Sequence, residues 1–177
     1  MRIQNQLEVP VPLADAWSFL LDIPSTIECF PGAELTEKVE EDTYRGRITV
    51  KLGPVAMIFG GTVRVEALDE VSHTGSFKAN WSETKGRGNA VTVTRFSMQA
   101  SEAVTRVDLE TDLQLAGQVA QYGRGAGVIA HISSELIDRF AANLRARLSN
   151  GEMEQGEIRG LTLASRALLS RFKRKSD

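Results

Sequence analysis

The sequence predicts an α+β domain in which a curved antiparallel sheet of about seven strands wraps around one long C-terminal helix. A strand pattern opens the chain, period-two alternation recurs through residues 34–116 with short turns between the runs, and a helical pattern follows at 128–148. Consecutive strands joined by short turns form an antiparallel meander, and a large sheet must twist and curl. The concave face and the helix would then bury each other, and a loose wrap would leave a cavity between them.

The N-terminal part of the chain predicts one strand and two short helices. Residues 2–9 alternate between apolar and polar side chains, with Ile3 and Leu7 on one side, as in a half-buried strand. Pro12 suits the first turn of a helix, and the apolar spacing of LADAWSFLLD continues that helix. Residues 22–33 contain two prolines and a Pro-Gly pair, so we expect a short second helical piece that ends in a turn.

The middle of the chain, residues 34–116, is predicted to be entirely strand. Its runs alternate with period two and are separated by turn sequences, among them Gly53-Pro54 and the segment 85–89. The pair Gly60-Gly61 inside the third run predicts a β-bulge or a sharp bend. The long helix at about 128–148 is predicted from apolar residues spaced by three and four, namely Ile129, Ile132, Leu136, Ile137, Phe140, Leu144 and Leu148.

Size and composition limit the function classes. A chain of 177 residues is enough for one domain with a sizeable core. It contains no run of about 18 apolar residues that would span a membrane, and its N-terminus lacks the apolar core of a signal peptide, so we expect a cytoplasmic protein. The single cysteine, Cys29, has no partner for an internal disulfide and suits a reducing compartment.

The charge is unevenly distributed along the chain. Residues 156–177 carry six basic residues against two acidic ones, a net charge of +4, whereas the other 155 residues carry −6. The acidic body argues against nucleic-acid binding and leaves the end of the chain as the part attracted to an anionic surface. We therefore expect a folded domain at 1–148, a polar linker at 149–157 and a basic amphipathic tail at 158–177.

The tail has the pattern of a segment that lies on a membrane surface. On a helix, its apolar residues would share one face while most basic residues tend towards other faces. The alternatives are a further helix packed on the body and an unstructured solubilising end. We expect peripheral binding to the inner face of the cell membrane through Ile158, Leu161, Arg166, Leu168, Leu169, Arg171, Phe172, Lys173, Arg174 and Lys175.

Motifs for cofactor, metal and nucleophile chemistry are poorly matched. GRGAG at 123–127 lacks the third glycine of a dinucleotide-binding loop and follows an antiparallel meander. The histidines His73 and His131 lie far apart, and no C-x-x-C or H-x-x-x-H spacing occurs. No G-x-S-x-G motif occurs, and Cys29 has no visible base partner. We expect no catalytic residue, no metal ligand and no covalently bound cofactor.

A cavity between the sheet and the long helix is the strongest functional candidate. Core packing explains any single apolar residue, but methionine and aromatic side chains gathered on one face give adaptable and flat walls. Such a cavity suits an apolar ligand, including a ring-bearing one. We expect it to be lined by Met57, Phe59, Val63, Phe77, Trp81, Phe96, Met98, Tyr122, Ile129, Ile132 and Leu136.

The glycines before the long helix have two explanations. Gly123, Gly125 and Gly127 let the start of the helix lie close to the sheet, or they form a mobile gate over the cavity with Tyr122 near its mouth. We expect the gate to govern ligand exchange.

Four stretches of the sequence carry a family resemblance: VPVPLADAWSFLLDIP, CFPGAEL, KLGPVAMIFGGTVRVEALDE and GQVAQYGRGAG. Together they resemble the CoxG family, the G subunits of carbon monoxide dehydrogenase, within the START-like helix-grip superfamily (SRPBCC), over residues 1–148. The resemblance implies a helix-grip fold and a non-catalytic accessory protein of a molybdenum hydroxylase of the carbon monoxide dehydrogenase type. It also implies that the protein brings that enzyme to the membrane, connects it with the respiratory quinone pool and binds a hydrophobic ligand in its cavity.

Three function hypotheses follow from these observations. The first is a quinone-binding membrane adaptor, whose cavity takes the ring and isoprenoid chain of a quinone such as menaquinone and whose tail holds it at the bilayer. The second is a pure recruitment factor whose cavity is filled by side chains. The third is a cyclase or hydrolase of the same superfamily. This hypothesis is the weakest, because the sequence shows no convergent set of acid and base residues.

Overall fold

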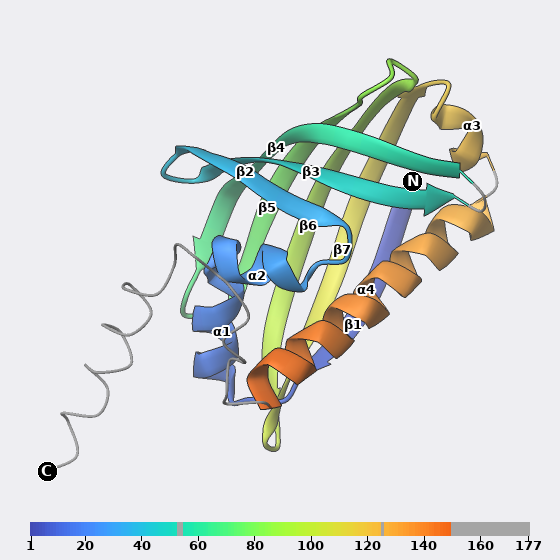
Figure 1. The fold of residues 1–177 in the computed structure, drawn as a ribbon. Coiled ribbons are helices and arrows are strands. Elements are labelled where there is room, and N and C mark those ends of the chain that lie inside the picture. The colour runs from blue at the N-terminus through green and yellow to red at the C-terminus, as the bar shows by residue number, and fades with distance from the viewer. Residues whose placement is uncertain (53–54, 125, 150–177) are drawn as a thin grey trace, which may run out of the picture.

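A computed structural model of the protein describes residues 1–52, 55–124 and 126–149. The elements follow the predicted order, with one short helix, α3, added before the last (Figure 1). They are β1 (Arg2–Val9), α1 (Leu13–Leu21), α2 (Ile23–Cys29), β2 (Ala33–Glu40), β3 (Thr43–Leu52), β4 (Val55–Asp69), β5 (Thr74–Glu83), β6 (Gly88–Ser101), β7 (Val104–Gly117), α3 (Ala120–Gly123) and α4 (Ala126–Ser149).

The seven strands form one antiparallel sheet in the order β1-β7-β6-β5-β4-β3-β2. Consecutive strands from β2 onwards pair with each other, and the first strand pairs with the last, so that Arg2 lies opposite Asp112 and Val9 opposite Thr105. Figure 1 shows the sheet curving around α4, with α1 and α2 beside the C-terminal part of that helix and α3 near its start. The predicted fold class, a curved antiparallel sheet around a long C-terminal helix, is confirmed.

The C-terminal half of α4 is packed tightly against the rest of the domain. Phe140, Ala141 and Leu144 belong to a buried cluster with Ala16 and Trp17 of α1 and with apolar residues of β1, β6 and β7. We call this cluster the closed-end core. Ala16 and Leu144 are both 0% exposed, and the small side chain of Ala16 leaves room for the neighbouring groups.

Polar contacts fasten the same half of α4 to α2. The Asn143 side chain donates a hydrogen bond from Nδ2 to the main-chain carbonyl of Cys29 at 2.9 Å. Arg147 binds Glu28 through an Nη1–Oε2 ion pair of 2.5 Å, and its guanidinium lies 5.8 Å from the centre of the Phe19 ring. These contacts fix the angle at which α4 leaves the closed-end core.

A second buried cluster lies at the other end of the sheet. Met57, Phe59 and Val119 are buried there, and the half-buried Trp81 and Tyr122 pack against them. Among the described residues the two clusters have no member in common. Neither cluster therefore fills the interior between them.

Two glycines have roles that the structure explains. Gly32, in the turn between α2 and β2, has φ +77°, and a Cβ there would lie 2.6 Å from the Thr49 carbonyl oxygen. Of the bulge or sharp bend predicted at Gly60-Gly61, the bulge is wrong, because β4 keeps its register with both neighbours there and the irregularity falls between Val65 and Ala67. A Cβ at Gly61 would lie 2.0 Å from the Asn80 carbonyl oxygen, so this glycine permits the close approach of β5.

The turn between β5 and β6 is built around a buried carboxylate. Glu83 has a side chain that is 1% exposed, and its Oε2 accepts hydrogen bonds from the main-chain N–H groups of Lys85 and Arg87 at 2.9 and 3.1 Å. Desolvation alone would raise the pKa of Glu83, but these two N–H groups and the positive charge of Arg87 outweigh it. The pKa of Glu83 consequently lies below its ordinary value.

Truncation of Leu144 should destabilise the domain strongly. Leu144→Ala removes a fully buried side chain from the closed-end core, and we expect the free energy of unfolding to fall by about 2–5 kcal/mol. The matched control is Leu68→Ala, since Leu68 is 48% exposed, and it should cost less than about 1 kcal/mol. Urea denaturation of both variants measures the difference. Equal losses would contradict the assignment of Leu144 to the core that holds α4.

Protonation of Glu83 should contribute to acid destabilisation. A carboxylate whose pKa is lowered by folding stabilises the native state above its unfolded pKa of roughly 4.3 and loses that contribution as the pH falls through its folded pKa. Glu83→Gln should therefore lower the thermal midpoint at pH 7. The difference in thermal midpoint between the variant and the parent protein should become smaller below about pH 4. The exposed Glu66→Gln serves as the control. A difference in thermal midpoint that does not change with pH would show that the negative charge of Glu83 does not stabilise the fold.

Candidate functional site

A cavity of about 470 Å³ lies between α4 and the concave face of the sheet. Its volume falls within the range of roughly 300–1,000 Å³ that is usual for small-molecule sites. Every strand of the sheet and each of the helices α1 to α4 contribute to its lining, and most of the lining side chains are apolar. The cavity occupies the interior between the two buried clusters, under the N-terminal half of α4, which lines it with Ile129, Ile132 and Leu136.

The eleven residues predicted to bind a ligand all line this cavity. They are Met57, Phe59, Val63, Phe77, Trp81, Phe96, Met98, Tyr122, Ile129, Ile132 and Leu136. Alternation along β4, β5 and β6 turns the strand residues inwards, and spacing by three and four places Ile129, Ile132 and Leu136 on one face of α4. Their contact with a ligand stays a prediction.

The sequence did not predict the part of the cavity lining that comes from β2, β3 and the end of α2. Leu35 of β2, Tyr44, Ile48 and Val50 of β3, and Phe30 at the end of α2 also line the cavity. The alternation of Tyr44, Ile48 and Val50 in TYRGRITVKL carried a usable signal. Phe30 carried none, because its direction depends on how α2 ends.

A few uncharged polar side chains interrupt the apolar wall. Ser133 of α4 donates a hydrogen bond from Oγ to Oδ1 of Asn5 on β1 at 2.8 Å. The hydroxyl groups of Thr94 on β6 and Thr111 on β7 lie 2.9 Å apart. All four residues line the cavity, and each strand residue occupies an inward position in its strand's alternation. We call these four residues the polar band.

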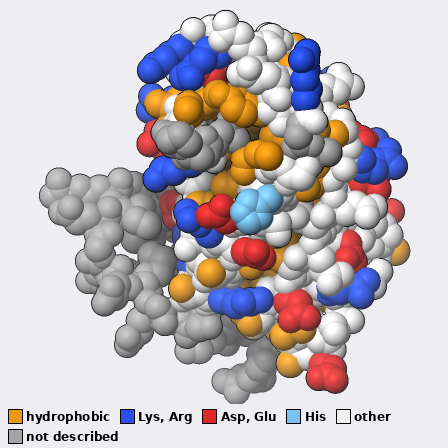
Figure 2. Space-filling model, turned by 90° about the vertical axis from the view of Figure 1, so that its right-hand side faces the viewer, with side chains coloured by type: hydrophobic (Ala, Val, Ile, Leu, Met, Phe, Trp, Pro, Cys, Tyr) orange, Lys and Arg blue, Asp and Glu red, His pale blue; other side chains and the backbone are white. Residues whose placement is uncertain are grey.

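The charged residues that border the cavity are paired at the surface. Arg47 binds Glu34 with an Nη2–Oε2 distance of 2.9 Å, and Arg45 binds Glu37 at 2.6 Å, with all four side chains more than half exposed. Neither pair faces the polar band, since these side chains lie on the outward positions of β2 and β3. Figure 2 shows one side of the molecule, where apolar side chains gather around a hollow in the upper half and charged side chains lie around them.

The structure describes two of the three glycines of the predicted gate. Gly123 ends α3, and a Cβ there would lie 3.3 Å from Cδ1 of Leu115, so it fits closely against β7. Gly127 is in the first turn of α4, where an added Cβ would meet nothing within 4 Å, and Gly125 lies outside the described residues. Tyr122 is half-buried and lines the cavity. The gating role stays a prediction.

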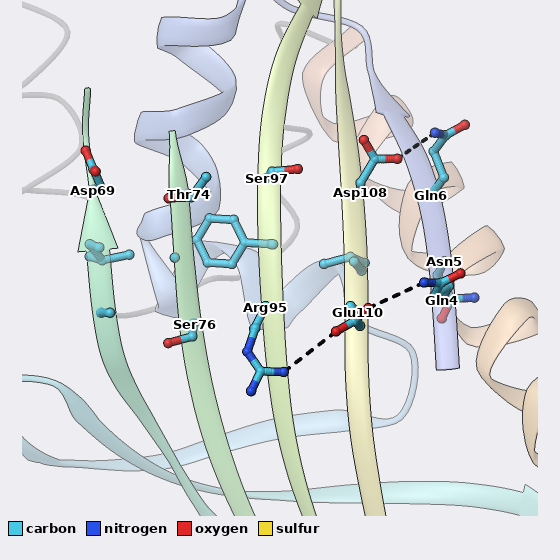
Figure 3. A pocket seen from close by; sticks show the side chains of 15 residues that line it. Gln4, Asn5, Gln6, Asp69, Thr74, Ser76, Arg95, Ser97, Asp108 and Glu110 are labelled. Atoms are coloured by element: carbon cyan, nitrogen blue, oxygen red, sulfur yellow. Dashed lines mark hydrogen bonds and ion pairs between the residues drawn. The ribbon is translucent and has the colours of Figure 1, made fainter. Parts of the chain in front are cut away.

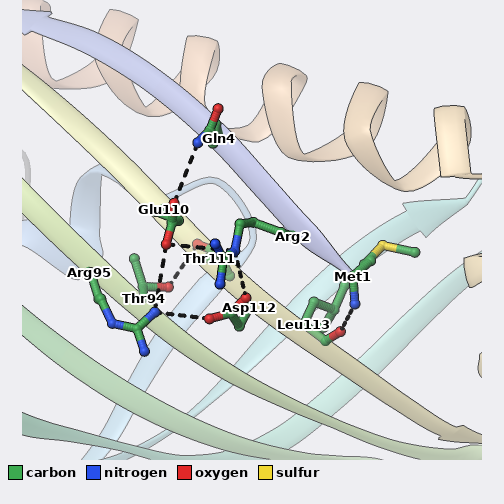
Figure 4. Close-up of polar contacts among 9 residues, drawn as sticks. All are labelled: Met1, Arg2, Gln4, Thr94, Arg95, Glu110, Thr111, Asp112 and Leu113. Carbon is green, nitrogen blue, oxygen red and sulfur yellow. Dashed lines mark hydrogen bonds and ion pairs between the residues drawn. The ribbon is translucent and has the colours of Figure 1, made fainter.

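A second hollow crosses the outer face of the sheet and has a different character. It is a shallow groove with charged side chains that are already paired, including Asp108 with Gln6 at 2.6 Å and Arg95 with Glu110 at 3.8 Å (Figure 3). Beside it, Arg95 and Arg2 both bind Asp112 and hold the pKa of that carboxyl below its ordinary value (Figure 4). These pairings leave the groove a weaker candidate for a ligand site than the inner cavity.

The described residues show no arrangement typical of a reactive or metal site. Cys29 is buried, and desolvation raises the pKa of its thiol, which disfavours the reactive thiolate. No group of three His, Cys, Asp or Glu side chains within residues 1–52, 55–124 and 126–149 is placed to hold a metal ion. No helix in that same part of the chain is long and apolar enough to cross a membrane.

The predicted tail cannot be placed in the fold. Residues 150–177 lie outside the described residues. They include all ten predicted membrane-binding residues and, apart from residue 149, the whole predicted linker at 149–157. The helix predicted to end at Leu148 ends at Ser149.

Solved structures with the same fold include several proteins of low sequence identity. A conserved protein from Geobacillus kaustophilus superimposes with a TM-score of 0.73 at 16% identity, covering 84% of this chain and 95% of that one. The Zhui aromatase/cyclase from Streptomyces sp. R1128 gives 0.58 at 12% identity, covering 84% and 95%. Protein Ms6760 from Mycobacterium smegmatis gives 0.59 at 18% identity, covering 84% and 90%.

These likenesses show the fold, which is the helix-grip fold. A search of curated proteins found no significant match. Residues 6–149 match the family described as the G subunit of carbon monoxide dehydrogenase (CoxG). The match spans most of the chain, and the chain therefore belongs to the CoxG family of carbon monoxide dehydrogenase subunits.

Proposed function

We propose that this protein is a non-catalytic accessory protein that carries a hydrophobic ligand, a respiratory quinone such as menaquinone, for a molybdenum hydroxylase of the carbon monoxide dehydrogenase type. The observation that carries the proposal is the apolar cavity of about 470 Å³ between α4 and the sheet. The name of the family supports the choice of enzyme partner.

The walls of the cavity suit a flat ring with an apolar chain. Phe59, Phe77 and Trp81 provide planar surfaces, while Met57 and Met98 can adjust to an irregular shape. Burying the apolar surface of such a ligand supplies the driving force, at roughly 25 cal/mol per Å² removed from water. A quinone has this combination of a planar ring and an isoprenoid chain.

The basic tail supplies the second part of the proposal, which is recruitment to the membrane. A carrier of a membrane-soluble ligand has to reach the bilayer to exchange it, and each basic group near an anionic leaflet contributes roughly 1 kcal/mol. The apolar residues of 158–177 would add insertion to that attraction. The gate at Gly123, Gly125 and Gly127 would admit the ligand to the cavity.

An enzymatic function has weaker support. The Zhui aromatase/cyclase shares the fold, but its 12% identity carries no activity over to this chain. The polar band within the described cavity is uncharged, whereas acid–base chemistry needs titratable groups at the reacting atoms.

A quinone bound in the cavity should quench the fluorescence of Trp81. We expect a short-chain menaquinone to quench the parent protein, and Trp81→Phe to remove most of that quenching, because Trp81 lines the cavity. Trp17→Phe is the matched control, since Trp17 is buried in the closed-end core beside His73 and Phe96. A fluorescence titration of the three proteins measures the effect. The opposite result, with quenching retained in Trp81→Phe and lost in Trp17→Phe, would show that the ligand binds elsewhere.

The tail should bind anionic membranes reversibly. In co-sedimentation with vesicles containing phosphatidylglycerol, we expect the full chain to pellet and a chain ending at Asn150 to stay in solution. Binding should weaken at 1 M salt, where the Debye length is about 3 Å, and should be lower on vesicles of neutral lipid. If both proteins pellet equally, or if neither does, the membrane role of residues 158–177 is excluded.

A further inference from the structure

We propose that the polar band is the head-group subsite of the cavity, and that it binds the carbonyl oxygens of an uncharged ligand through the Asn5 amide and the Thr94–Thr111 hydroxyl pair. The inference rests on the proposed function, because it requires that the cavity holds a ligand. It adds which side chains orient that ligand and which chemical group they select.

The strand register brings these side chains together on the concave face. Thr94 lies directly opposite Thr111, and Thr111 lies opposite Ile3 on the next strand. Asn5 is two residues from Ile3 and therefore faces the same side as a diagonal neighbour of Thr111, at a distance of about 7–8 Å. Ser133 reaches Asn5 from α4, so the band crosses from β6 through β7 and β1 to the helix.

Some hydrogen-bond donors of the polar band have no partner in the described part of the protein. The Asn5 amide uses Oδ1 to accept from Ser133, and no partner for its two Nδ2 hydrogens occurs among the described residues. Thr94 and Thr111 share one hydrogen bond, which uses one of their two hydroxyl hydrogens and leaves the other. Because the surrounding wall is mostly apolar, a ligand or water must satisfy these donors.

The chemistry of the band selects a neutral acceptor. Amide N–H and hydroxyl donors without a nearby cation favour a carbonyl oxygen over an ionised carboxylate, which would lose its hydration without gaining an opposite charge. The cations that border the cavity, Arg45 and Arg47, are paired with glutamates on the outer positions of the sheet. Ser133 acts as a positioning residue, because its hydrogen bond to Oδ1 holds the Asn5 amide in one orientation.

Two probes with the same carbon skeleton separate this subsite from the apolar cavity. The first is 2-methyl-1,4-naphthoquinone, and the second is 2-methylnaphthalene, which lacks the carbonyl groups. Thr94→Val/Thr111→Val replaces both hydroxyls by methyl groups of the same shape, a change that can be nearly neutral for stability. Asn5→Leu/Ser133→Ala removes the other donor together with its partner. Thr62→Val, on β4 outside the cavity lining, is the matched control.

We expect each double variant of the full chain to bind the quinone about three- to tenfold more weakly, as the loss of one or two uncharged hydrogen bonds predicts. Affinity for the hydrocarbon, measured by the same calorimetric titration, should stay within about twofold in all variants, because it depends on apolar contact alone. Thr62→Val should bind both probes like the parent protein.

Three outcomes would overturn the inference. If the parent protein binds both probes and neither double variant loses affinity for the quinone, or if both probes weaken equally, the polar band is not the head-group subsite while the ligand-carrying function stands. If the parent protein binds neither probe, the proposed function fails and the subsite fails with it.

Discussion

The packing of α4 over one half of its length is the constraint on which the rest of this structure depends. Phe140, Ala141 and Leu144 are buried in the closed-end core, and Arg147 and Asn143 fasten the same half to α2. A helix is stiff, so fixing one half also fixes where the other half lies. The N-terminal half is thereby held over the concave face without collapsing onto it, and the cavity results from that geometry.

The sequence predicted the fold because periodicity alone determines most of it. Alternation in β4 to β6 placed Met57, Phe77 and Trp81 on the inward face, and a meander of strands has few ways to pair. Residues whose place depends on non-local packing were harder to find. Phe30 and the short helix α3 are examples, because their positions follow from how neighbouring elements meet.

The polar band was missed for a different reason. Asn5 occupies the inward parity of its strand between Ile3 and Leu7, Thr111 lies between Leu109 and Leu113, and Thr94 lies between Thr92 and Phe96. Each looks like an ordinary interruption when its strand is considered alone. Only the register between β1, β7 and β6 shows that the interruptions adjoin one another. The role of Gly61 could not be predicted for the same reason, because it depends on the carbonyl of Asn80 on the neighbouring strand.

The pairing of β1 with β7 sets the order in which this domain can be completed during synthesis. The first strand leaves the ribosome early but finds its hydrogen-bonding partner only after six more strands have been made. Non-local pairing of this kind carries a high loop-closure cost and is typical of slow-folding β topologies. Because α4 follows β7, the edge strand β1 and the apolar concave face stay uncovered until nearly the whole domain has emerged. The nascent chain is therefore most prone to aggregation just before α4 is made.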